Sequence, residues 1–273
     1  MIDSAELSIG GRKFRADFNS GVSLAIDLHF HGQQPRVFGS PLAKASPTVS
    51  ENFIGSVKKG GACNVESVNA SFHTSGTHTE CVGHISRNKI SISDLMENNL
   101  ILTTLITITP EVIRNDSYHV PTKEGELIIT HSSIEKAFTE AGGHLGNGLV
   151  VRTIPNDESK LTRDYNRERF PFFSNEAMRH IRELNVRHLL VDTPSVDRAD
   201  DGGQLGNHRI FWNVPPGVTE IDPDSCSRRT ISEMFYAPDS VKDGLYLLNL
   251  QVPSFLSDAA PSRPVVYPLH ATS

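Results

Sequence analysis

Residues 171–197 read PFFSNEAMRHIRELNVRHLLVDTPSVD, and this stretch indicates how the chain folds. Its first half repeats apolar residues at helical spacing, with Ala177 and Ile181 on one stripe, so we predict a helix over residues 174–184. A β-rich apolar run over residues 186–191 follows and predicts a strand. A loop, a helix and a strand in direct succession are typical of an α/β protein.

The same alternation recurs along the chain. Leu100–Thr109, LILTTLITIT, is the strongest strand candidate, and Pro110 ends it. The other predicted strands are Val22–Leu28, Leu149–Ile154, Leu245–Val252 and Val265–Tyr267, and the other predicted helices are Ser91–Glu97 and Ser132–Ala141. In the last of these, Ser132 stands three residues before Glu135, which is the spacing of a capping box. Residues 31–50 form the longest early segment without periodicity.

Composition excludes several classes of protein. The 273 residues carry a net charge of -6, which makes a nucleic-acid-binding surface an unfavoured interpretation. Three cysteines cannot build a disulfide framework, and their odd number favours a reducing compartment. No apolar run approaches the roughly 18 residues of a membrane span, and the first residues do not resemble a signal peptide. We expect a soluble, cytoplasmic protein of one large domain or two small ones.

The most informative chemistry lies in residues 73–84, HTSGTHTECVGH. On an extended stretch, His78 and Glu80 point to one face and can share one ion. Imidazole and carboxylate suit zinc, manganese or iron. Gly76 lets the chain turn so that His73 and His84 can converge on the same place. The alternative is that these residues are hydrogen-bonded core or surface groups.

Cys81, inside the same cluster, would point away from His78 and Glu80 on an extended chain, so we interpret it as a buried, inert thiol.

The segment GTHTECVGH resembles the signature H-x-G-T-H-x-D-x-P-x-H of the cyclase family of metal-dependent hydrolases, which includes bacterial kynurenine formamidase (arylformamidase) and isatin hydrolase. The resemblance continues in AIDL at 25–28, VVRT at 150–153, the 171–197 stretch, LLNLQVPSF at 247–255 and PSRPVVYPL at 261–269. It covers most of the chain in the family's order. It implies a single α/β domain over residues 1–273, with a central mixed β-sheet or barrel-like core and flanking helices.

The departures from the signature mark a divergent member. His73 stands five residues before His78, where the family spaces these by four, and one inserted residue such as Ser75 is expected to bulge the strand. Glu80 replaces the family's aspartate, and Val82 stands where the family has proline.

Site residues follow from the resemblance, residue by residue. It implies a divalent metal, zinc or manganese, as one or two ions, held by His73, His78, Glu80, His208 and Glu233. The gap between His208 and Glu233 is about twice the family's usual length, and an insertion at 211–225 would absorb it. The resemblance also implies that His84 is the catalytic proton donor and acceptor and that Phe38 binds substrate.

Other interpretations of several residues stay open. Glu233, three residues after Thr230, also fits a helix capping box, and His208 also fits a loop. Asp192 and Asp197 can either orient ligating histidines or cap a turn around proline 194, and we favour the turn. Arg152 fits a partner of a substrate carboxylate or of a neighbouring aspartate. Six further histidines are interpreted as structural or surface residues: His119, His131, His144, His180, His188 and His270.

The leading hypothesis is a metal-dependent hydrolase that cleaves a C–N bond of a small amide or cyclic amide, as an arylformamidase of tryptophan catabolism does. Three alternatives are a metal-dependent lactonase or cyclase, a catalytically inactive small-molecule-binding protein on the same fold, and a hydrolase with Cys81 as nucleophile and His84 as base. The resemblance further implies a homodimer or homotetramer and a small-molecule substrate, with neither nucleic acid nor membrane as partner.

Overall fold

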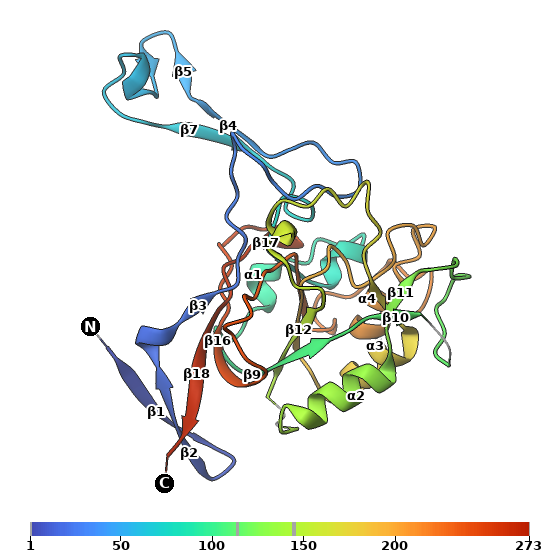
Figure 1. Ribbon diagram of the computed structural model, residues 1–273. Coiled ribbons are helices and arrows are strands. Elements are labelled where there is room, and N and C mark those ends of the chain that lie inside the picture. The colour runs from blue at the N-terminus through green and yellow to red at the C-terminus, as the bar shows by residue number, and fades with distance from the viewer. Residues whose placement is uncertain (1, 113–114, 144–145, 273) are drawn as a thin grey trace.

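The computed structural model describes residues 2–112, 115–143 and 146–272, and a large mixed β-sheet organises it (Figure 1). In pairing order, the strands of this sheet are β1 (Ser4–Ile9), β2 (Arg12–Asp17), β18 (Val265–Ala271), β16 (Gly244–Asn249), β9 (Leu100–Ile108), β12 (Gly148–Thr153), β14 (His188–Val191), β15 (Thr230–Glu233), β8 (His78–Glu80) and β17 (Ala259–Pro261), with β3 (Val22–Ser23) paired to β18. The expected α/β class and mixed sheet are confirmed.

Four parallel strands, β9, β12, β14 and β15, form the middle of the sheet, and antiparallel strands extend it on both sides. The middle strands are buried on both faces, so their side chains alternate between two cores. Leu149 and Val151 face the larger core, whereas Val150 faces the smaller one. The sequence of β12 is apolar on both faces for this reason.

Helices α2 (His131–Glu140) and α3 (Asn175–Glu183) supply apolar side chains to the larger core, to which α1 (Ile92–Leu95) and α4 (Gly206–Trp212) also contribute. Ser174 caps α3 by accepting a hydrogen bond from the Ala177 amide at 3.0 Å, and the helix starts within one residue of the predicted position. In α2 the capping box consists of Thr130 and Ser133, two residues before the pair we predicted, Ser132 and Glu135.

Most predicted strands are confirmed, and the differences lie at their ends. Val22–Leu28 pairs with the sheet only at β3, because beyond it the chain makes a single bridge from Ala25 to Phe235. The last strand, β18, runs four residues beyond the predicted end at Tyr267 because it also pairs with β2.

Three small sheets complete the described strands: β4 (Lys44–Pro47) with β7 (Glu66–Asn69), β5 (Val49–Ser50) with β6 (Phe53–Ile54), and β10 (Glu111–Val112), β11 (Leu127–Ile129) and β13 (Phe172–Phe173) together. The 3₁₀ turns are η1 (Phe18–Ser20), η2 (Val57–Lys59), η3 (Val82–Ile85) and η4 (Glu158–Leu161). Residues 44–69 form an arm that stands away from the body of the molecule (Figure 1). The end of the aperiodic 31–50 segment therefore forms β4 and β5, which run along this arm.

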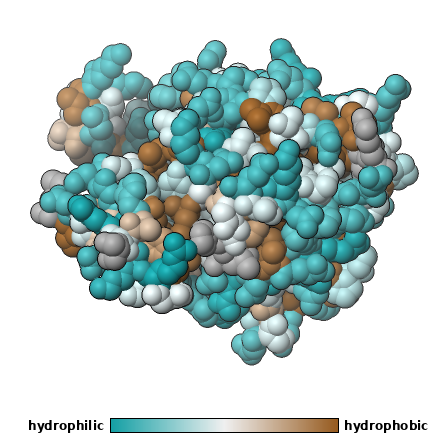
Figure 2. Space-filling view, turned by 60° about the horizontal axis from the view of Figure 1, so that its bottom comes forward, coloured by the Kyte–Doolittle hydropathy of each residue, from teal (hydrophilic) through white to brown (hydrophobic). Residues whose placement is uncertain are grey.

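The face of the molecule seen in Figure 2 is largely hydrophilic, with apolar side chains in scattered patches. Within the described residues, the helices are all too short or too polar to cross a bilayer.

His188, at the start of β14, provides a test of the fold by pH. Burial, together with the nearby Arg187, lowers its pKa from 6.5 to about 4. Folding therefore keeps this ring neutral, and the stability that depends on it is present above pH 6.5 and lost as the pH falls toward 4. The loss should reach about 2–3 kcal/mol at pH 4.5. We expect urea unfolding to show that the free energy of unfolding falls less between pH 7 and pH 4.5 for His188→Gln than for the wild type. Equal decreases in the two proteins would contradict a destabilising role of the buried His188 ring in acid.

Candidate metal centre

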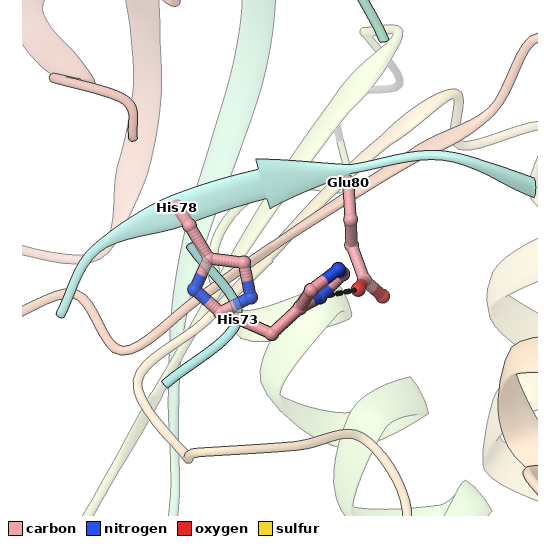
Figure 3. A group of neighbouring side chains, drawn as sticks. All are labelled: His73, His78 and Glu80. Atoms are coloured by element: carbon pink, nitrogen blue, oxygen red, sulfur yellow. Dashed lines mark ion pairs between the residues drawn. The ribbon is translucent and has the colours of Figure 1, made fainter. Parts of the chain in front are cut away.

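Strand β8 carries two of the predicted metal ligands on one side of the sheet. His78 and Glu80 are buried and two residues apart, and an extended chain points such residues to the same face. In Figure 3 both side chains extend from β8 to the same side of the strand, and the His73 ring lies next to them. Glu233, the last residue of β15, pairs directly with His78. The sheet therefore brings these predicted ligands to one place.

Residue His73 reaches this place from a turn, which corrects the bulge expected in the strand. The turn closes with the amide of Ser75 donating to the carbonyl of Ser71 at 2.9 Å. Gly76 then has φ of 110°, a left-handed conformation that glycine adopts without strain. Because the extra residue lies in the turn, β8 begins regularly at His78.

Glu233 belongs to a strand, so the alternative of a helix capping box is wrong. His208 lies on α4 rather than in a loop, and its ring is buried.

Three imidazole rings are each fixed by an acceptor on one nitrogen. A hydrogen bond on one ring nitrogen leaves the other free to bind a metal, and such pairs are the usual support of ligating histidines. The three pairs are His78 Nδ1 to the Gly76 carbonyl at 3.0 Å, His208 Nδ1 to Asp197 Oδ2 at 2.7 Å, and His73 Nε2 to Asp258 Oδ2 at 2.8 Å.

The second nitrogen of each ring faces a buried carboxylate. Glu80 lies between two of them, with Oε2 2.9 Å from His73 Nδ1 and Oε1 2.9 Å from His208 Nε2. Glu233 Oε2 lies 3.5 Å from His78 Nε2, and its other oxygen accepts a hydrogen bond from the amide of Val196 at 3.0 Å. Three nitrogens and two carboxylates thus converge.

One atom of this cluster indicates that a cation belongs there. His78 Nε2 is buried and has no hydrogen-bond partner among the described residues, whereas Glu80 Oε1 lies 2.9 Å from His208 Nε2. Leaving a buried polar atom unpartnered is costly, and a metal ion would satisfy His78 Nε2. The donor set of imidazole and carboxylate fits zinc or manganese.

The charged groups of the cluster shift each other's pKa values. Burial disfavours the carboxylate form of Glu80, but the neighbouring His84 and His208 outweigh it and hold its pKa well below the ordinary value. Burial likewise opposes the charged form of His208, but Glu80 and Asp197 raise its pKa well above the ordinary value. Protons therefore occupy the positions that a metal would take, so metal binding should release protons.

His84 lies on η3, at the edge of this cluster. Its Nδ1 is 3.5 Å from Asp258 Oδ2 and 3.9 Å from Glu80 Oε2. Its side chain is 27% exposed, whereas that of His78 is fully buried. The ring can therefore exchange protons with solvent while it touches the site.

Asp197 orients His208, so the turn that we favoured does not describe its role. Besides His208, it accepts a hydrogen bond from the Tyr118 hydroxyl at 2.9 Å. Asp192 has no such role, because it forms a buried ion pair with Lys160 at 2.7 Å.

Sequence reasoning missed Asp258, which holds His73. It precedes β17, whose first residue, Ala259, pairs with Glu80, and its own carbonyl accepts from the Cys81 amide at 3.0 Å. A separation of 185 residues from His73 left no local signal for this contact.

Replacing Asp258 with Asn should weaken metal binding about 10-fold to 100-fold, because the neutral amide no longer fixes the His73 ring as firmly. Competition with a fluorescent chelator measures this affinity directly. The matched control is Asp224→Asn, an exposed position that should keep wild-type affinity. An unchanged affinity in Asp258→Asn would show that His73 does not depend on this carboxylate.

Phe38 is half-exposed, and its ring packs edge-on against Phe170 at 6.3 Å. Phe170 belongs to a small core with Met234, the residue after Glu233. A second aromatic pair was not singled out from the sequence: Phe72, adjacent to His73, stacks on Phe255 at 5.6 Å. Phe72 thus precedes a site residue in the chain, and Phe170 packs with the residue that follows another site residue.

Arg152 is used within the fold. Its guanidinium donates to the carbonyls of Pro238 and Val241 and to Asp243. Of the two interpretations of this arginine, the structure supports the one in which it binds a neighbouring aspartate rather than a substrate carboxylate.

Cys81 is fully buried, and burial raises the pKa of its thiol to about 12. A nucleophilic thiolate needs a lowered pKa, so the geometry favours an inert thiol. We expect Cys81→Ala to keep activity within about twofold, with a stability loss of about 1–2 kcal/mol for the lost packing. Thiol titration of the native wild type should label exposed Cys63 and leave Cys81 unreacted. Loss of turnover in the folded variant would restore the thiol mechanism.

Of the other histidines, His188 is buried in β14, and His131 and His180 pack on each other between α2 and α3. His119 bonds to Asp201 at 3.1 Å. His270 is exposed on β18, and His144 lies outside the described residues.

Comparison with solved structures shows the same fold at low identity. A "predicted metal-dependent hydrolase" from Bacillus stearothermophilus is 16% identical with a TM-score of 0.56, and the match covers 91% of this chain and 98% of that one. Isatin hydrolase A from Labrenzia aggregata, bound to benzyl benzoate, is 14% identical with a TM-score of 0.58, covering 90% and 93%. Isatin hydrolase A from Ralstonia solanacearum is 15% identical with a TM-score of 0.59, covering 90% and 91%.

No protein of curated function matches the sequence. Residues 22–198, more than half of the chain, match the profile of the family named Cyclase and described as "putative cyclase". The matched range includes the 73–84 segment, and the fold agrees. The chain is therefore a divergent member of the Cyclase family.

Proposed function

We propose that this protein is a metal-dependent hydrolase that cleaves the C–N bond of a small amide or cyclic amide, with arylformamides as one candidate class. The observation that carries the proposal is the set of three fixed imidazoles around the buried Glu80, with His78 Nε2 left without a hydrogen-bond partner. The solved structures named as a metal-dependent hydrolase and isatin hydrolases support the class of reaction.

The proposed metal ligands are the five predicted from the sequence. One or two divalent ions would be held by His73, His78, Glu80, His208 and Glu233. When bound, zinc or manganese supplies Lewis acidity and lowers the pKa of water to about 7.

The protein itself contributes orientation and proton transfer. Asp197 and Asp258 hold two of the imidazole rings, which limits reorganisation during the reaction. His84 keeps Nδ1 toward Asp258, so Nε2 is the nitrogen placed to exchange a proton. We propose that this ring accepts the proton of the attacking water and returns it to the leaving amine.

The test combines metal analysis with a substrate panel. Untagged protein should carry one or two equivalents of zinc or manganese. N-formylaniline and an aryl lactam should be hydrolysed, and a chelator should abolish the turnover until metal is restored. Turnover of the matching lactone alone would make the protein a lactonase. Protein that stays metal-free after incubation with either ion would make it a binding protein.

We propose further that the protein is a homodimer or homotetramer. The arm of residues 44–69 supports this, because Val49, Val57 and Val68 are more than half exposed on it. Light scattering should give a multiple of the chain mass. Val49→Asp combined with Val68→Asp should shift it toward the monomer, and a wild-type monomer would exclude the proposal.

A further inference from the structure

A second cavity lies on the side of α4 away from the metal centre. It consists of two adjoining hollows with volumes of about 590 and 660 Å³. The larger of them lies between α3 and α4. His208 of α4 faces Glu80 and Asp197, whereas its neighbours Arg209 and Ile210 line this cavity. The helix therefore separates two sites.

Three arginines give the larger cavity its charge. Arg179 and Arg182 come from α3 and Arg209 from α4, and the described lining residues include no carboxylate. The one carboxylate bonded to them is Glu176, whose pair with Arg179 at 3.1 Å is partly exposed and therefore weak. The larger hollow thus has a net positive lining, whereas Glu220 and Asp222 line the smaller one.

Bonds to the protein hold two of these guanidinium groups in place. Arg182 Nη1 donates to the Asn213 side chain at 2.7 Å, and Arg209 Nη1 donates to the carbonyls of Pro215 and Val218. Each guanidinium has five N–H donors, and these bonds use only some of them. A guanidinium already fixed loses little freedom when it binds a carboxylate, which it can do through two parallel bonds.

Part of the lining is apolar. Ile210, Val214, Pro215 and Pro216 contribute to it, and a charged group alone would leave this surface unused. A ligand with an anionic end and a flat or aliphatic body satisfies both the arginines and the apolar wall. We propose that this cavity is a second binding site, separate from the metal centre, for a small organic carboxylate.

The cavity also reaches the support of the metal centre. His119 lines it and lies 4.0 Å from Asp197, the residue that holds His208. Its ring is closely confined, because a Cβ on Gly206 would lie 2.2 Å from it. The two sites are therefore neighbours that share a wall and no proposed metal ligand.

Calorimetric titration with benzoate tests the proposal. One equivalent should bind to the metal-loaded protein and equally to chelator-treated protein, because the cavity needs no metal. Inorganic phosphate should bind at least fivefold more weakly, since it cannot use the apolar wall. Loss of benzoate binding after chelation would place the anion at the metal centre and overturn the proposal. Equal binding of phosphate would overturn the assignment of an organic carboxylate.

Two exposed positions allow variants that should fold. Arg179→Gln should weaken benzoate binding at least fivefold, and Pro216→Glu should do the same by placing a like charge in the wall. The matched control is Arg187→Gln, an exposed arginine outside this cavity. Wild-type affinity in both cavity variants would overturn the proposal. Because the titration is read without turnover, it is independent of whether the metal centre hydrolyses amides.

Discussion

Replacing Glu80 with Gln is expected to remove the bound metal and to lower turnover about 10³-fold, a rise in the barrier of about 4 kcal/mol. Glu80 lies between His73 and His208, 2.9 Å from a nitrogen of each, so it belongs to two of the residue groups that could hold an ion here. Gln keeps the volume and one oxygen, but it removes the negative charge on which a divalent ion depends. Elemental mass spectrometry of the purified variant measures the metal directly.

The control for this variant is Glu220→Gln, an exposed glutamate paired with Arg87. It should keep wild-type metal and turnover. Circular dichroism should be used to check that Glu80→Gln folds, because removing this carboxylate leaves the neighbouring imidazoles without their buried counter-charge. A folded Glu80→Gln that retains the full metal content would contradict the ligand role of Glu80, and with it the proposed hydrolase.

The local part of the site could be predicted from the sequence. His78 and Glu80 converge because a strand repeats every two residues, and this geometry needs only a short stretch of chain. Gly76 similarly indicated a turn before the strand. The position of the inserted residue was not predictable, because a bulge in β8 and a longer turn before it leave the same local pattern.

The supporting carboxylates depend on contacts between distant segments. Asp258 meets His73 only because β17 pairs with β8 at the edge of the sheet. Asp197 supports His208 only because α4 forms next to it. This helix begins after Leu205, which has a φ of 49° and provides no side-chain cap. The sequence at this position therefore carries no signal for the start of a helix.

The fold was more predictable than the site. Buried parallel strands such as β12 and β14 contain a continuous apolar run, so their sequence identifies them without tertiary information. The short strands β15 and β17 have four and three residues, and their pairing partners define them. The first carries Glu233 and the second directly follows Asp258, which explains why the details of the site were harder to predict than the core.

His84→Ala should separate chemistry from metal binding. If the ring transfers the proton, kcat should fall about 10²-fold to 10⁴-fold while the metal content and KM stay near the wild-type values. The structure gives His84 a position suited to this role, since its ring is partly exposed and lies 3.5 Å from Asp258, beside the more deeply buried ligand cluster. His31→Ala, at an exposed histidine outside the cluster, should change neither quantity.

The competing outcome has a structural basis as well. Glu80, His84 and His208 also lie close enough together to hold an ion. If His84→Ala loses an equivalent of metal along with activity, His84 is a ligand and another group must move the proton. His84→Gln sharpens the distinction, because its amide can accept a hydrogen bond but cannot act as a base near neutral pH. Retained metal with lost turnover in both variants would establish the imidazole as the proton carrier.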